Sequence, residues 1–302
     1  MQRILNSNQP VAWAFVPLTG LVLFLASVGL GRTDVQSWPG FLGMCVAARL
    51  LHLLHVESGM RTRPGSLPSW VWMLVAVPFI GGPSDWAWWA SCGLIQGLRL
   101  AMGVRDSDGN PGTFLFIGMW WGLAVLAEAT IWPLLPAFAI TLMLVKRPGA
   151  DETVSGFIGL LTPLLIATAG VWLMELRLTP CWGWRPESIG MEPYRMVWLA
   201  IPTGLGWMLR QQSIVRATAQ QRFARQLTQW SGASGVLVVL LMTGFSWTTQ
   251  GQWPSASSAF PCALAFLASW SWPWLMPPGF KLTKAMPYVF VAMSLALLVL
   301  KF

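Results

Sequence analysis

Long apolar stretches separated by short polar segments run along almost the entire chain. They predict about eleven helical spans. These lie at roughly 11–30, 38–56, 69–82, 84–103, 113–131, 133–147, 154–175, 195–210, 232–249, 257–276 and 286–302. The spans 69–82, 133–147 and 195–210 are short for a bilayer core about 30 Å thick, so each fits either a full crossing or a re-entrant segment.

Two longer polar segments interrupt this pattern. Residues 176–194 form the longest loop on one side, and residues 211–230 the longest on the other. In the second, Phe223, Leu227 and Trp230 follow helical spacing, and arginines occupy the polar positions. This arrangement is typical of a helix on the inner leaflet, with its arginines beside anionic headgroups. A solvated basic linker is the alternative.

Composition extends the same interpretation to the whole chain. Of the 302 residues, 55% are hydrophobic and 10% are charged, and the mean hydropathy is +0.58. A soluble domain carries about 25% charged residues. We therefore expect an all-α integral membrane protein with about eleven transmembrane helices, forming one polytopic domain over residues 1–302.

The distribution of basic residues predicts an orientation. The net charge is +8. With the N-terminus in the cytoplasm, most lysines and arginines fall in cytoplasmic segments, as the positive-inside rule requires, and the C-terminus lies outside. Anionic lipids of the inner leaflet are then the expected partners. Nucleic acid is excluded as a partner, because the chain lacks a basic surface interleaved with aromatic residues.

No motif of a soluble enzyme is present: the chain lacks a Walker loop, GxGxxG, GxSxG and HExxH. The four cysteines are not paired at metal-ligand spacing. His52 and His55 form a polar stripe with Arg49 in "RLLHLLH", but a metal site would need a third ligand. We expect neither a metal nor a cofactor, and a stripe that faces an interhelical crevice or the headgroups.

Two carboxylates on the predicted outer side are candidate catalytic residues. Glu128 lies in "WWGLAVLAEATIW", near the outer end of an apolar span. An ionisable group inside a membrane often marks a substrate or proton path, although Glu128 could also reach interfacial water before Pro133 ends the helix. Asp34, in "GRTDVQSWPG", lies in the first outer loop.

Aromatic residues accompany these carboxylates. The 21 tryptophans form belts at both expected interfaces. In "PSDWAWWAS" (83–91), Ser84 or Asp85 is predicted to cap a helix, and the three tryptophans of the segment point in different directions, so they cannot all stack on one ligand. Acids, arginines and flat rings together suit a phosphorylated, sugar-bearing or lipid-linked substrate. The candidate binding residues are Asp85, Trp89, Arg177, Trp182, Trp184 and Arg185.

The N-terminal stretch "RILNSNQPVAWAFVPLTGLVLFL" (3–25) combines a basic residue, "SNQP" and a first span with an early proline. It resembles an uncharacterised family of polytopic inner-membrane proteins of Bacteroidota-type bacteria, of roughly this length. The likeness covers little more than the first span. It implies a location in the bacterial inner membrane and a role in envelope glycan or lipid chemistry, and it carries over no catalytic residue.

Three functions remain open. The first is an envelope protein that handles a polyprenyl-linked or other amphiphilic substrate at the outer face. Its enzymatic form resembles glycosyltransferases that use lipid-phosphate sugars and carry an acid in the first outer loop, where Asp34 lies. The second is a transporter or flippase that uses Glu128 and helix-kinking prolines. The third is a non-catalytic subunit that anchors other membrane proteins in an envelope complex.

Overall fold

The computed structural model describes residues 10–31, 33–59, 65–80, 85–104, 110–128, 131, 134–145, 149–174, 193–211, 218, 221–234, 237, 259–275 and 286–299. Within these ranges every regular element is a helix, as the apolar pattern predicted. The α-helices are α2 (Pro10–Gly29), α3 (Trp38–Glu57), α4 (Leu67–Ala76), α5 (Trp86–Gly103), α6 (Pro111–Ala127), α7 (Leu135–Val145), α8 (Ala150–Leu173), α9 (Pro193–Gln211), α11 (Ala259–Trp270) and α12 (Met286–Val299). Short 3-10 helices are η1 (Val35–Ser37), η2 (Val77–Phe79) and η6 (Trp272–Trp274), and residues 221–234 are also helical.

The helices match the predicted spans to within a few residues wherever the structure describes them. The third span is divided, because α4 ends at Ala76 and η2 carries Pro78. Proline has no N–H to continue an α-helical hydrogen-bond ladder. Most of the predicted span 232–249 lies outside the described residues.

Among the described residues, two helical stretches are long and apolar enough to cross a membrane. Val35–Glu57 has 23 residues with a hydropathy of 1.4, and Ala150–Leu173 has 24 residues with a hydropathy of 1.9. The second is mostly exposed along its apolar length, whereas the first is more than half buried in the bundle. Several other helices, among them α4, α6 and α7, are apolar but shorter.

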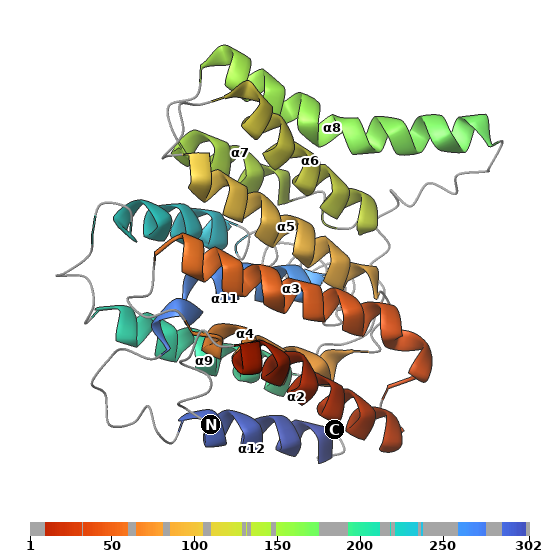
Figure 1. Ribbon diagram of the computed structural model, residues 1–302, viewed down its shortest axis with the longest axis vertical. Helices are drawn as coiled ribbons and strands as arrows, with labels where there is room; N and C mark the ends of the chain where they lie inside the picture. The colour runs from red at the N-terminus through yellow and green to blue at the C-terminus, as the bar shows by residue number, and fades with distance from the viewer. Residues whose placement is uncertain are drawn as a thin grey trace.

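Glycines hold the helices on one side of the bundle together. α5 packs between α3 and α6, and α6 packs against α8 (Figure 1). Gly118 of α6 lies against the Gly156 backbone, and Gly122 lies against the Leu160 backbone, so the two helices run parallel. A side chain at Gly118 would overlap the Gly156 carbonyl oxygen. Small residues at such a seam allow helix backbones to approach closely.

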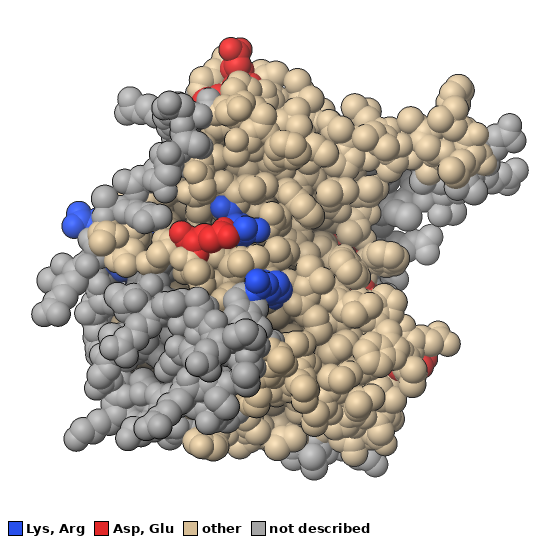
Figure 2. Space-filling model, in the orientation of Figure 1, with Lys and Arg blue, Asp and Glu red and all other residues tan. Residues whose placement is uncertain are grey.

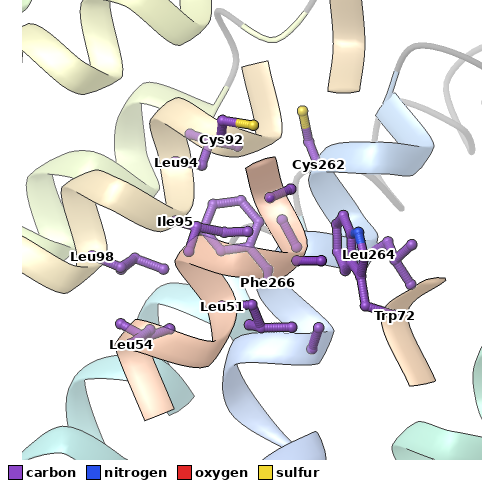
Figure 3. Packing of buried hydrophobic residues seen from close by; sticks show 14 of the residues in the cluster. Leu51, Leu54, Trp72, Cys92, Leu94, Ile95, Leu98, Cys262, Leu264 and Phe266 are labelled. Atoms are coloured by element: carbon purple, nitrogen blue, oxygen red, sulfur yellow. The ribbon is translucent and has the colours of Figure 1, made fainter. Parts of the chain in front are cut away.

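Large aromatic side chains fill the centre of the bundle. Trp72 of α4 packs edge-on against Trp88 of α5, with ring centroids 6.1 Å apart, and against Trp272 at 6.5 Å. Trp72 Nε1 donates a hydrogen bond of 3.2 Å to the Met44 carbonyl of α3. Figure 3 shows Phe266 of α11 close to Leu51 in the same cluster. These contacts fix α3, α4, α5 and α11 around one core.

Most of the described arginines lie at one end of the bundle. There, Gln221 Nε2 donates to the Gly59 carbonyl just after α3, which brings the start of helix 221–234 to this end. We call it the basic end, and its described arginines are Arg99, Arg210, Arg222 and Arg225. The opposite end, where α3 begins, holds Asp34 and Asp85. Among the described residues, charged side chains are sparse on the face shown in Figure 2.

Candidate functional site

Asp34, a predicted catalytic residue, serves as a local cap. It precedes η1, and its Oδ1 accepts a hydrogen bond of 3.2 Å from the Gln36 backbone N–H. The side chain is exposed. Capping of this kind satisfies a backbone donor at a helix start, so the carboxylate already has a structural task.

Asp85 and Trp89 both contact the first turn of α3. Trp89 Nε1 donates a hydrogen bond of 3.0 Å to the Pro39 carbonyl. The Asp85 carboxylate packs on Gly40, where a Cβ would lie 2.5 Å from Oδ1. Asp85 occupies the N-cap position of α5, but its side chain makes no capping hydrogen bond. The predicted cap by Asp85 is therefore wrong, because the close approach of α3 directs the carboxylate toward Gly40 instead; Ser84, the other predicted cap, lies outside the described residues.

The other two tryptophans of this segment point elsewhere, as predicted from helical geometry. Trp86 is 63% exposed, whereas Trp88 is 2% exposed and packs against Trp72. Trp86 is therefore a surface residue and Trp88 a core residue. Of the three tryptophans, Trp89 alone is half-buried, and it is anchored to α3 by its indole N–H.

Glu128 is buried at the end of α6. It is 9% exposed, and its backbone N–H donates to the Ala124 carbonyl at 3.0 Å as the last hydrogen bond of the helix. Its carboxylate lies near Cys262 at the start of α11. The remaining predicted binding residues, Arg177, Trp182, Trp184 and Arg185, lie outside the described residues.

A cavity of about 320 Å³ lies between α2, α3 and α4. Its wall is mainly apolar, formed by residues that include Val16, Val46 and Met73. Cavities of about 300–1,000 Å³ are the usual size of small-molecule sites, so this one lies at the lower end of the range. The full lining is Val16, Pro17, Cys45, Val46, Ala48, Arg49, Leu50, His52, Ser66, Ser69 and Met73.

The cavity extends from the side of the bundle into its interior. Pro17, Val46 and Arg49 of its lining are exposed, whereas Ser69 and Met73 are buried. The opening therefore lies between α2 and α3, on the long side of the bundle rather than at an end. If the bundle spans a membrane, this opening faces lipid.

Polar groups enter the cavity from α3 and α4. Arg49 and His52 are two members of the predicted polar stripe, and they face an interhelical crevice, one of its two expected settings. Ser69 is 2% exposed, and its hydroxyl has no hydrogen-bond partner within the described part of the chain. The stripe was visible in the sequence, whereas the contribution of Ser69 depends on how α3 and α4 pack.

Besides Arg99, the basic end carries arginines on α9 and on helix 221–234. Arg210 donates to Gln229 and lies 5.1 Å from the Trp207 ring centroid. Burial, with Arg210 and Arg222 nearby, lowers the pKa of the Arg225 guanidinium. In the predicted apolar stripe of this helix, Leu227 is buried and Trp230 is exposed, so only part of the stripe packs into the bundle. Contact of this helix with anionic headgroups stays a prediction.

No family model, curated protein or solved structure matches the chain.

Proposed function

We propose that the protein is a multi-pass protein of the bacterial inner membrane that binds an amphiphilic substrate. The observation that carries this proposal is the cavity between α2, α3 and α4, which opens on the side of the bundle. An apolar wall with a few polar groups suits a molecule that has both a hydrocarbon part and a polar head. Access from the side suits a molecule that is dissolved in the bilayer.

The cavity also changes where we expect binding. The sequence pointed to the outer face, but two of the described candidates there have local tasks: Asp34 caps η1, and Trp89 joins α5 to α3. The cavity lies between the middle of α3 and the basic end, in the cytoplasmic half if the N-terminus is inside. We therefore place the substrate there, and we propose binding rather than a catalytic step.

Two substitutions on α3 test this proposal. Val46 lines the cavity mouth and is 40% exposed, whereas Leu42, one turn earlier, is 52% exposed and does not line the cavity. A tryptophan at position 46 should block the opening without disturbing the core, and a tryptophan at position 42 is the matched control.

The protein and both variants would be extracted in polymer-bounded native nanodiscs, and the lipids would be measured by mass spectrometry. We expect one lipid class to be enriched over the bulk membrane in the wild type and in Leu42→Trp, and to return to the bulk level in Val46→Trp. Equal lipid composition in the wild type and Val46→Trp would refute binding in this cavity.

The second half of α8 favours an alternative function, a non-catalytic subunit of an envelope complex. Leu165, Ile166 and Trp172 are 64%, 66% and 80% exposed, which leaves an apolar face beyond the seam with α6. A membrane-protein partner could cover this face in place of lipid. Cross-linking from position 166 in native membranes distinguishes a protein partner from lipid on this face. A partner gives a discrete protein adduct, and lipid gives none.

A further inference from the structure

The polar groups of the cavity are gathered toward one end. α3 and α4 are antiparallel neighbours, because α4 begins shortly after α3 ends and Trp72 in the second half of α4 bonds back to Met44 in the first half of α3. His52 and the Ser66 preceding α4 therefore lie toward the basic end, and Cys45 and Met73 lie toward the middle of the bundle. A ligand in this cavity meets polar groups at one end and hydrocarbon at the other.

The Ser69 hydroxyl indicates that the ligand has a polar atom within the cavity. Serines and threonines in helices commonly satisfy the hydroxyl on the carbonyl four residues earlier, as Thr141 and Ser269 do here at 2.7 Å each. Ser69 lies in the first turn of α4, where the carbonyl four residues earlier precedes the helix, and its hydroxyl makes no hydrogen bond within the described residues although it is almost completely buried beside the cavity. A buried donor left without an acceptor is destabilising. A ligand oxygen would supply the acceptor.

The charges at the cavity mouth favour an anion. Arg49 lines the cavity and lies near enough to Arg99 for the two guanidinium groups to repel each other. Glu57 contacts Arg99 through both of its carboxylate oxygens. Two cations and one carboxylate therefore lie at or beside the cavity mouth, and an anionic headgroup there would reduce the repulsion that remains between Arg49 and Arg99.

We propose that the ligand is an amphiphile with one anionic headgroup, a carboxylate or a phosphate. This inference rests on the proposed function. Arg49 binds the headgroup by charge-assisted hydrogen bonds, and the Ser69 hydroxyl donates to one of its oxygens. The hydrocarbon chain lies along Val16, Val46 and Met73. The small volume of the cavity fits a single chain.

Equilibrium binding to protein in phosphatidylcholine nanodiscs tests this assignment, with empty nanodiscs subtracted. The probes are radiolabelled dodecyl phosphate, dodecanoate and dodecyltrimethylammonium, which share one chain and differ in the head. We expect the better anionic probe to bind at least about tenfold more tightly than the cationic one, as a hydrogen bond to a charged group implies. The comparison of phosphate with carboxylate then decides between a lipid phosphate and a fatty acid.

The variants separate this inference from the proposed function. Arg49→Gln should remove the preference for anions, and Arg49→Lys should keep part of it. Arg222→Gln, which changes an exposed arginine on another helix, should leave it intact. Ser69→Val should weaken anion binding severalfold without lowering thermal stability, since no hydrogen bond within the described chain is lost.

Two results would overturn the headgroup assignment. In the first, Arg49→Gln keeps the preference for anions while Val46→Trp still abolishes the binding of all three probes. This result would confirm binding in the cavity and refute recognition of the charge by Arg49. The other is equal binding of the three probes to the wild-type protein. Binding that neither variant alters would instead remove the proposed function, and the inference with it.

Discussion

Arg99 of α5 holds Glu57 at the end of α3 through two hydrogen bonds, from Nε to Oε2 at 2.5 Å and from Nη2 to Oε1 at 2.7 Å. The same guanidinium contacts Gln96 of its own helix through Nη1 at 3.1 Å. The ion pair joins two helices at the basic end, one of which lines the cavity. Its strength therefore affects how firmly the cavity wall is held.

We expect this ion pair to contribute little to stability despite its geometry. The two side chains are 26% and 47% exposed, and exposed pairs are worth at most about 1 kcal/mol. A double-mutant cycle with Glu57→Gln and Arg99→Gln, read by the free energy of unfolding in detergent, should give a coupling below about 1 kcal/mol that shrinks at high salt. A coupling unaffected by salt would contradict this expectation.

The seam between α6 and α8 predicts opposite effects for two glycines of one helix. A Cβ at Gly159 would overlap the Leu115 carbonyl oxygen, whereas a Cβ at Gly170 meets nothing within 4 Å. Gly159→Ala should push α8 away from α6 and destabilise the protein, because a backbone atom cannot yield. Gly170→Ala should be neutral or stabilising by up to about 1 kcal/mol through helix propensity.

Thermal unfolding of both glycine variants measures the two effects. A spin-label distance between α6 and α8 reports the separation directly. A Gly159→Ala variant with wild-type stability and distance would show that the two helices do not pack this closely.

Trp86 and Trp88 provide a matched pair for the core. Trp88 is 2% exposed against Trp72, and Trp86, two residues earlier, is 63% exposed. Trp88→Ala should cost about 3–5 kcal/mol, the usual range for a large buried aromatic side chain. Trp86→Ala should change stability by less than about 0.5 kcal/mol. Denaturant unfolding in mixed micelles compares the stability of the two variants. Equal losses in the free energy of unfolding would contradict the assignment of Trp88 to the core.

Cys45 provides a native probe of the cavity. It lines the cavity and is half-buried, whereas Cys92 and Cys262 are buried elsewhere. With the other three cysteines replaced by serine, Cys45 should react slowly with N-ethylmaleimide, and a bound amphiphile should slow the reaction further. The rate is followed by mass spectrometry in nanodiscs. Labelling that a saturating amphiphile does not slow would exclude its binding beside Cys45.

The helices of this protein were predictable because apolar length alone marks them. The 3-10 turn at Pro78 follows from the chemistry of proline, but its position at the end of α4 depends on tertiary packing. The buried part of helix 221–234 was less accessible to sequence reasoning. Ser231 bonds to Thr141 of α7 at 2.7 Å, a contact between residues far apart in the chain that no local pattern encodes.

The candidate site shows the same limit. Arg49 and His52 could be identified from the sequence as candidates because polar residues are rare within an apolar span. Ser69 and Met73 look like ordinary helix residues, and they matter only because α4 packs antiparallel to α3. The role of Asp85 depends likewise on a contact with Gly40 of a preceding helix.

The sideways opening of the cavity has a consequence for how affinity is expressed. If the bundle spans a membrane, as proposed, a ligand that enters between α2 and α3 comes from the surrounding bilayer and never crosses bulk water. Occupancy then depends on the mole fraction of the ligand among the lipids, not on its aqueous concentration. Diluting the ligand with inert lipid at constant total volume should empty the cavity, whereas adding buffer at a constant ligand-to-lipid ratio should leave it filled.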